Sequence, residues 1–210
     1  MGVKGLNLRG VREFCRAWLH QPELLLPHVS VRDLNEVSFQ ALRDRGFTAA
    51  VQNADAKHVI VQDSFDECKR VFGDRVLIFS NSAGSNDDSA FLKAAQIERE
   101  LGVAVLRHNQ KKPGGIEHVK AFFEADPETL VMIGDRYSTD VLFGNLYGLL
   151  TIRTDQFTQE DESFVNRLMQ KIEKAMIGRL ERQSTERSPH PLLPDVNAIT
   201  LEQQHQAPRQ

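Results

Sequence analysis

Residues 131–140, which read VMIGDRYSTD, decide the fold of this chain. Three apolar side chains are followed directly by Gly134 and Asp135, and the next residues open a polar stretch that favours a helix. A strand without polar positions fits burial on both faces of a parallel sheet. We expect Gly134 to let the backbone turn tightly at the strand end, so that Asp135 projects from the carboxyl edge of the sheet. Asp140 lies five residues on, where it can face the same cleft.

The same alternation continues on both sides of this stretch. Five short apolar runs, rich in β-branched residues, alternate with polar segments that favour helices. The runs are Phe47–Val51, Val76–Phe79, Val103–Leu106, Thr129–Ile133 and Leu149–Ile152, and the segments are Asp63–Phe72, Asp87–Leu101, Gly115–Glu124 and Ser138–Leu146. This order predicts an α/β fold, a doubly wound, Rossmann-like parallel sheet of about five strands with helices on both faces. Right-handed crossovers place all carboxyl ends of the strands at one edge, where sites form.

Composition excludes several classes of protein. A chain of 210 residues corresponds to roughly one domain. Its 26 basic and 29 acidic residues give a net charge of −3, so the overall charge gives no case for nucleic-acid binding. Two cysteines, Cys15 and Cys68, exclude a disulfide scaffold and a cysteine-built zinc site. No run of about 18 apolar residues occurs, which excludes a membrane-spanning helix.

The two ends of the chain differ in character from its centre. We divide the chain into a basic, amphipathic segment (1–34), an α/β domain (35–182) that ends in an amphipathic helix (160–182), and a polar, disordered tail (183–210). The basic start is either an organelle transit peptide or an ordinary first helix. The helix at 160–182 either packs on the sheet or rests on anionic lipid through its basic face. The sequence says nothing about the oligomeric state.

Three groups of residues at strand ends suggest chemistry on a phosphate. Asp135 and Asp140 suit Mg²⁺, a hard cation that prefers oxygen ligands, although either acid alone could cap a helix. Ser80 and Asn81, which follow another strand, fit a phosphate-binding nest, although such residues also form turns. Lys112 precedes Pro-Gly after a third strand and could place its ammonium over a phosphate, although loop lysines are usually solvated.

Taken together, these motifs resemble motifs two, three and four of the haloacid dehalogenase phosphatase superfamily. The stretches SNSAGS (80–85), VLRHNQKKPGG (105–115) and IGDRYSTDVLFGNLYG (133–148) more closely resemble the mitochondrial phosphatidylglycerophosphate phosphatase family. The resemblance includes QPELLLPHVSVRD (21–33) and runs to about residue 155. It implies a fold without a large cap domain.

The resemblance also implies a function and a set of roles. It implies a Mg²⁺-dependent hydrolase that removes the terminal phosphate of phosphatidylglycerophosphate, a phospholipid, and yields phosphatidylglycerol for the cardiolipin pathway. Ser80 and Asn81 would bind the phosphoryl group, Lys112 would balance its charge, Asp135 and Asp140 would hold Mg²⁺, and Arg136 could reach a substrate phosphate. Such a protein is expected at the matrix face of the inner mitochondrial membrane, in peripheral contact with anionic lipid.

The first motif of this superfamily is Asp-x-Asp at the end of a strand, and it is missing here. Its first Asp attacks phosphorus and its second acts as acid and base. Residues 52–62 follow the strand Phe47–Val51 and read QNADAKHVIVQ, without an Asp-x-Asp. If Asn53-Ala54-Asp55 occupies the motif, the nucleophile is replaced by an amide, whereas Asp55 remains a candidate acid and base. Splicing or an exon-boundary error is the simplest origin of this short connection.

Three functions therefore remain open from the sequence. The chain is a lipid-phosphate phosphatase, or it is an inactive isoform or relative that binds phosphate, Mg²⁺ or a protein partner without turnover. A receiver-like domain also clusters acids with a lysine, but its lysine follows the last acidic strand, whereas Lys112 precedes it.

Overall fold

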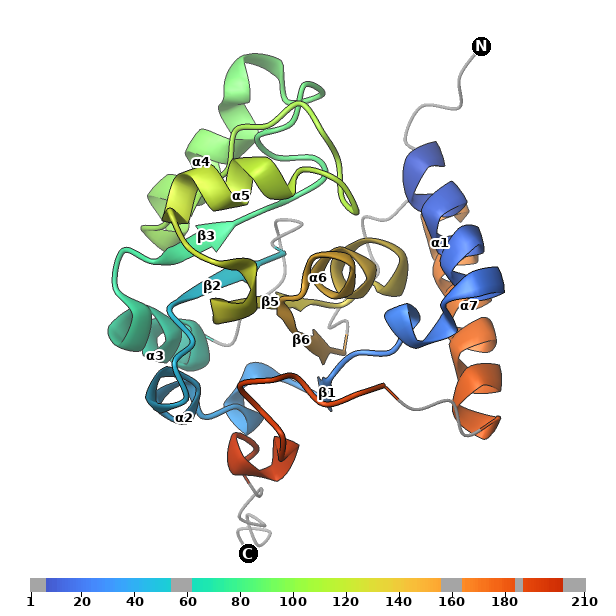
Figure 1. Cartoon of the computed structure of the whole chain (residues 1–210). Coiled ribbons are helices and arrows are strands. Elements are labelled where there is room, and N and C mark those ends of the chain that lie inside the picture. The colour runs from blue at the N-terminus through green and yellow to red at the C-terminus, as the bar shows by residue number, and fades with distance from the viewer. Residues whose placement is uncertain (1–6, 54–61, 156–163, 184–186, 202–210) are drawn as a thin grey trace, which may run out of the picture.

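A computed structural model describes residues 7–53, 62–155, 164–183 and 187–201. Its centre is a six-stranded sheet in the order β1-β6-β5-β2-β3-β4, in which every pair of neighbouring strands is parallel (Figure 1). The predicted doubly wound α/β fold is therefore confirmed. The strands are β1 (Val29–Val31), β2 (Ala49–Gln52), β3 (Val76–Ile78), β4 (Ala104–Val105), β5 (Leu130–Gly134) and β6 (Leu150–Thr154).

The sheet has one strand more than the sequence pattern predicts. Strand β1 lies within the segment 1–34 and pairs with β6 as the edge of the sheet, with Val29 opposite Ile152. Val29 and Val31 are buried and Ser30 is exposed between them. A three-residue strand with one exposed position lacks the continuous apolar run that identifies the central strands. The N-terminal segment thus contributes to the sheet.

Successive side chains of each central strand point to opposite faces of the sheet. Because these side chains are apolar, both faces are covered by helices. Val131 and Ile133 pack in one cluster with helices α2 (Phe39–Asp44), α3 (Gln62–Phe72) and α4 (Leu92–Leu101). Leu130 and Met132 pack in a second cluster with α5 (Ile116–Phe123) and α6 (Leu142–Tyr147). The strands are therefore buried on both faces, as the apolar runs predict.

A third cluster joins the two helices that lie outside this core. Helix α1 (Leu8–His20) contributes Phe14 and Ala17, and helix α7 (Phe164–Arg182) contributes Ile177 and Leu180. These residues pack around Tyr137, Val141 and Leu142, which follow β5. Figure 1 shows α1 and α7 next to each other beside the sheet. The predicted helix at 160–182 is thus described from Phe164 on, and it packs on the domain through its apolar side. Neither α1, α7 nor any other described helix is long and apolar enough to span a membrane.

Part of the predicted disordered tail is ordered against the sheet. Within 187–201, Leu193 and Ile199 are 0% and 1% exposed and belong to the cluster around α2 and α3. Thr200 forms a bridge with Val37. In the same segment, Arg187 donates a hydrogen bond to His28. Burial lowers the pKa of His28 to about 3. The expectation of a disordered tail is therefore wrong for 187–201, because a few apolar residues in a polar segment are enough to anchor it.

We expect Leu193→Ala to lower the free energy of unfolding by about 2–5 kcal/mol, because it opens a cavity in a fully buried site. Val196→Ala is the matched control, since Val196 is 36% exposed and its loss should cost less than about 0.5 kcal/mol. Urea unfolding followed by circular dichroism measures both. Equal, small losses in the two variants would show that residues 187–201 do not pack on the domain.

Candidate functional site

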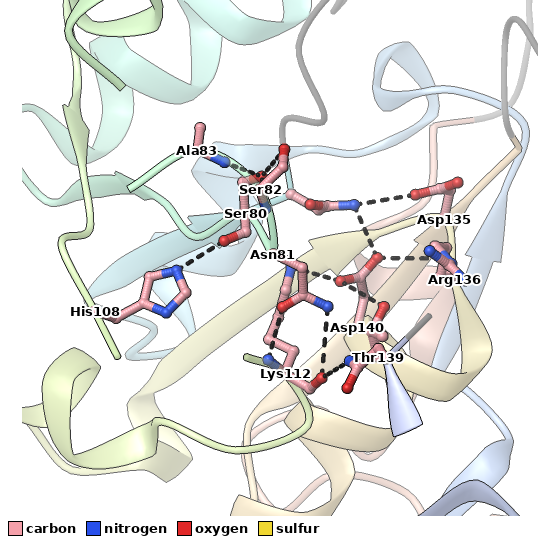
Figure 2. Close-up of polar contacts among 12 residues, drawn as sticks. Ser80, Asn81, Ser82, Ala83, His108, Lys112, Asp135, Arg136, Thr139 and Asp140 are labelled. Atoms are coloured by element: carbon pink, nitrogen blue, oxygen red, sulfur yellow. Dashed lines mark hydrogen bonds and ion pairs between the residues drawn. The ribbon is translucent and has the colours of Figure 1, made fainter. Parts of the chain in front are cut away.

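The ends of four parallel strands bring the candidate residues to one edge of the sheet (Figure 2). Asn53 follows β2, Ser80 and Asn81 follow β3, Lys112 lies in the loop after β4, and Asp135 follows β5. Strands β2 and β5 are neighbours, and the chain leaves them toward opposite halves of the sheet. Ligands of open α/β sheets bind at such a switch point. The edge therefore gathers the residues that the motifs predict.

Asn53 lies at the centre of this edge. Its backbone N–H extends the β2–β5 ladder to Ile133 O, 2.9 Å away. Its side-chain Nδ2 donates to Asp135 Oδ1 at 3.2 Å and to Asp140 Oδ2 at 3.1 Å. Its Oδ1 is buried and has no hydrogen-bond partner among the residues that the structure describes. Asn53 therefore bridges the two acids that the sequence assigns to Mg²⁺.

Asp140 and Lys112 form a buried ion pair beside Asn53. Lys112 Nζ lies 2.6 Å from Asp140 Oδ1, and both side chains are 1% exposed. Asp140 Oδ2 accepts from the backbone N–H of Arg136 at 3.2 Å as well as from Asn53. Both oxygens of Asp140 thus have donors, so Lys112 is neutralised in a place where an unpaired ammonium would be costly.

Local backbone geometry explains how Asp140 reaches this position. Residues Tyr137–Val141 form a π-helical turn before α6, and the N–H groups of Asp140 and Val141 both donate to Arg136 O. A Cβ on Gly134 would lie 2.5 Å from the carboxyl carbon of Asp140. The expected tight turn is therefore not the main reason for Gly134. The missing side chain leaves room for the carboxylate of Asp140.

The loop after β3 is organised around the hydroxyl of Ser80. Ser80 Oγ accepts the backbone N–H groups of Ser82 and Ala83, each at 3.1 Å, and Ser80 is fully buried. His108 Nε2 lies 2.8 Å from Ser80 O, and burial lowers the pKa of His108. Ser80 Oγ also lies 3.2 Å from Ser82 Oγ, so the two hydroxyl groups are paired at the start of this loop.

Asn81 and Asn7 hold the loop that carries Lys112. The backbone N–H of Lys112 donates to Asn81 Oδ1 at 2.7 Å, and Asn7 Nδ2 donates to Lys112 O at 2.6 Å. Asn7 is also the N-cap of α1, where its Oδ1 accepts the N–H of Gly10. The side chain of Asn81, which the sequence predicts to bind phosphate, thus binds the backbone of Lys112.

Arg136 and a glutamate from α7 stand at the outer side of the site. Both line a hollow with Asp135 and Arg153. Glu173 is 2% exposed and accepts the backbone N–H of Ser138 at 3.3 Å. Burial raises the pKa of Glu173, and the charge of Arg136 opposes this rise. Sequence reasoning missed Glu173, although an acid on the apolar stripe of helix 160–182 was a usable signal.

The residues at this edge fit a hard cation. Among the described residues, no group of three or more His, Cys, Asp or Glu side chains has the spacing of a metal site. This edge contributes two acids, Asp135 and Asp140. One oxygen of each acid lies within hydrogen-bond distance of the amide nitrogen of Asn53. Rotation of the Asn53 amide by half a turn would bring its Oδ1 to the position of the nitrogen, so that three oxygens would face one another. Two carboxylates and an amide oxygen are ligands that Mg²⁺ accepts, with water and substrate phosphate completing its shell. Asp55 lies outside the described residues.

The comparisons with known proteins point to one family. A family model described as mitochondrial PGP phosphatase matches residues 8–157. The phosphatidylglycerophosphate phosphatase 1 of Arabidopsis thaliana, named as chloroplastic/mitochondrial, is 34% identical over 205 residues, which is 91% of this chain. The chloroplastic phosphatidylglycerophosphate phosphatase 1 of Chlamydomonas reinhardtii is 33% identical over 202 residues, again 91% of this chain. The chain spans 58% and 75% of the lengths of these two proteins.

Shorter matches extend the comparison. The mitochondrial phosphatidylglycerophosphatase of Saccharomyces cerevisiae is 40% identical over 78 residues, 35% of this chain and 42% of the yeast protein. Human chronophin is 34% identical over 88 residues, 42% of this chain and 30% of its own length. No solved structure matches the chain.

We expect Asp140→Asn to lower the free energy of unfolding by about 3–5 kcal/mol, because it leaves the Lys112 ammonium buried without its counter-charge. The double variant Lys112→Met/Asp140→Asn should lose less than the sum of the two single variants, as in any coupled pair. Urea unfolding measures this cycle. Lys120→Met, which breaks an exposed pair with Glu117, is the control and should cost less than about 0.5 kcal/mol. Additive losses in the cycle would disprove the coupling.

Proposed function

The chain belongs to the family of mitochondrial PGP phosphatases, and we propose that its site binds the terminal phosphate of phosphatidylglycerophosphate together with Mg²⁺. We also propose that this chain hydrolyses the phosphate ester slowly or not at all. In an active relative the product would be phosphatidylglycerol, the precursor of cardiolipin. The observation that carries the proposal is the position of Asn53, at the end of β2 and within hydrogen-bond distance of Asp135 and Asp140.

Phosphate binding is supported by the charge and the donors at this edge. A phosphoryl oxygen would take the place of Ser82 Oγ as the hydrogen-bond partner of the Ser80 hydroxyl, and the ammonium of Lys112 would be shared between Asp140 and the phosphate. Asp135 and Asp140, with Asn53 Oδ1, would hold Mg²⁺. When bound, the metal supplies charge neutralisation for the phosphate. Arg136 lies at the outer side, where it can contact a further phosphate oxygen.

Slow hydrolysis follows from the chemistry of an amide. A carboxylate at the end of β2 would attack phosphorus and form an aspartyl-phosphate. The side chain of Asn53 carries no negative charge, and its nitrogen lone pair is delocalised into the carbonyl group. Asn53 can orient acids and ligate a cation, but it cannot form the acyl-phosphate bond. Binding without turnover is therefore the activity that these residues favour.

The test is to return a carboxylate to this position. With phosphatidylglycerophosphate in mixed micelles and Mg²⁺, we expect the unaltered chain to release phosphate at the background rate. Asn53→Asp should raise release by at least about two orders of magnitude, because nucleophile and acid–base groups each contribute factors of this size. Asn53→Gln is the matched control and should stay at background. Colorimetric phosphate assay measures all three.

Two outcomes would contradict the proposal. Mg²⁺-dependent release by the unaltered chain that disappears on Asp55→Asn would show that the chain is an active enzyme through Asp55. Failure of the unaltered chain to bind inorganic phosphate in calorimetry, with or without Mg²⁺, would show that the edge is not a phosphate site.

We further propose a peripheral position at the matrix face of the inner mitochondrial membrane. Two relatives are named as mitochondrial or chloroplastic/mitochondrial. Helices α1 and α7 both carry exposed apolar residues among basic ones, and they pack together next to the site. The exposed apolar residues are Leu8, Leu19, Leu168 and Ile172, and the exposed basic residues are Arg9, Arg12, Arg16, Arg167, Lys171 and Lys174. This composition suits a surface of anionic lipid.

We expect the chain to sediment with vesicles that contain phosphatidylglycerol and to remain in solution with neutral vesicles. Leu168→Ser/Ile172→Ser should reduce the bound fraction severalfold, because apolar side chains 47% and 43% exposed would no longer enter the lipid. Leu92→Ser, on α4 and 68% exposed, is the matched control and should bind like the unaltered chain. Equal binding by all variants to both vesicle types would exclude this contact.

A further inference from the structure

A cavity of about 240 Å³ opens beside the phosphate-binding residues. Its lining includes Asn81, Ser82 and Thr139, which adjoin Ser80 and Asp140 in the chain. It also includes Val11 of α1, with the N-cap Asn7, and Met169 of α7. The helices that flank the α/β core therefore enclose space directly adjoining the site where a phosphate monoester would lie.

Cations from separate elements line the outer part of this cavity. Lys93 lies on α4, Lys111 lies in the loop after β4, and Arg136 follows β5. Lys111 forms an ion pair with Asp87, which also lines the cavity and belongs to the loop after β3. Lys93 makes no ion pair with any residue in the described part of the chain, although its charge helps to lower the pKa of Asp87. The lining thus includes two lysines that have no role assigned at the phosphate site, together with two acids, the exposed Asp87 and the buried Glu173.

Hydrogen bonds in the loop between β3 and α4 fix the position of Lys93. The carboxylate of Asp88 accepts the backbone N–H groups of Gly84, Lys93 and Ala94 at 2.9–3.0 Å. These three bonds lower the pKa of Asp88 against the effect of burial. The start of α4 is therefore fixed relative to the turn after β3, and the position of Lys93 follows from it.

We propose that this cavity binds a second anionic group of the substrate, with Lys93 and Lys111 as its cations. The inference rests on the proposed function, because the phosphate monoester must lie at Ser80 and Lys112 for the second group to reach the cavity. Phosphatidylglycerophosphate carries such a group, a phosphodiester one glycerol away from the monoester. When it binds, Lys111 exchanges its contact with Asp87 for one with the phosphodiester.

The size of the cavity agrees with a headgroup. Its volume of about 240 Å³ lies just below the range of about 300–1,000 Å³ that is usual for sites of small molecules. A glycerol and a phosphate suit a cavity of this size better than a whole lipid does. The acyl chains would remain outside, on the side of α1 and α7. The proposed ligand is therefore a phosphate monoester whose second phosphate reaches Lys93 and Lys111.

The test compares two soluble ligands by calorimetry in the presence of Mg²⁺. Glycerol 3-phosphate carries the monoester alone, whereas deacylated phosphatidylglycerophosphate carries the monoester and the phosphodiester. We expect the unaltered chain to bind the second ligand about tenfold more tightly, as two charge-assisted contacts allow. Lys93→Gln/Lys111→Gln should reduce this ratio to about one and change the affinity for glycerol 3-phosphate by less than about twofold.

Two further variants separate a local site from general charge. Asp87→Asn should increase the ratio, because it frees Lys111 from its competing acid. Lys120→Gln, which removes an exposed lysine of α5 that does not line the cavity, should leave the ratio unchanged. An equal drop with Lys120→Gln would overturn the inference, since net charge alone would then explain it.

The outcomes for the unaltered chain also distinguish this inference from the proposed function. A ratio near one, with glycerol 3-phosphate still bound, overturns the second anionic subsite and leaves the phosphate site standing. Absence of binding by both ligands overturns the phosphate site itself and the inference with it.

Discussion

The rest of the site depends on the buried ion pair between Lys112 and Asp140, whose side chains are 1% exposed and 2.6 Å apart. Two charges removed from water are stable only when each has a counter-charge and further hydrogen bonds. Asp140 obtains them from Asn53 and from the backbone of Arg136, and the Lys112 loop is held by Asn81 and Asn7. These bonds connect the ends of β2, β3, β4 and β5, and they tie α1 to the same point. Satisfying one buried pair therefore fixes the whole edge, before any ligand arrives.

The sequence predicted the parts of this arrangement that are formed by continuous runs of apolar residues. Central strands such as β5 are apolar at every position, and the polar residues directly after them meet at one edge by topology alone. What the sequence missed depends on contacts between distant segments. Strand β1 is a three-residue edge strand, and Leu193 and Ile199 are isolated apolar residues in a polar segment, so neither has a local signal. The role of Gly134 was likewise invisible, because it comes from the space that Asp140 occupies.

Elements outside the α/β core contribute more to the site than their sequence suggests. Basic and amphipathic character at both ends of the chain points to membranes or transit, whereas the structure also places Asn7 and Glu173 at the site. Glu173 reaches the N–H of Ser138 from α7, and Asn7 joins the start of α1 to the Lys112 loop. Strand ends that meet at one edge of the sheet are common to many α/β proteins. The helices α1 and α7 contribute Val11 and Met169 to the lining of the cavity beside this edge.

An amide at position 53 gives the edge different electrostatics from those that a carboxylate would give it. A carboxylate at this position would stand about as close to Asp135 and Asp140 as the amide does, at 3.1–3.2 Å, and three carboxylates so close repel one another. Lys112 compensates one of them, so the remaining negative charge would require a bound cation. The amide of Asn53 instead donates to both acids and satisfies them without a metal. An amide at position 53 therefore makes the edge stable without a third negative charge, and under the proposed function it lowers the electrostatic demand for Mg²⁺ while keeping an oxygen that this ion accepts.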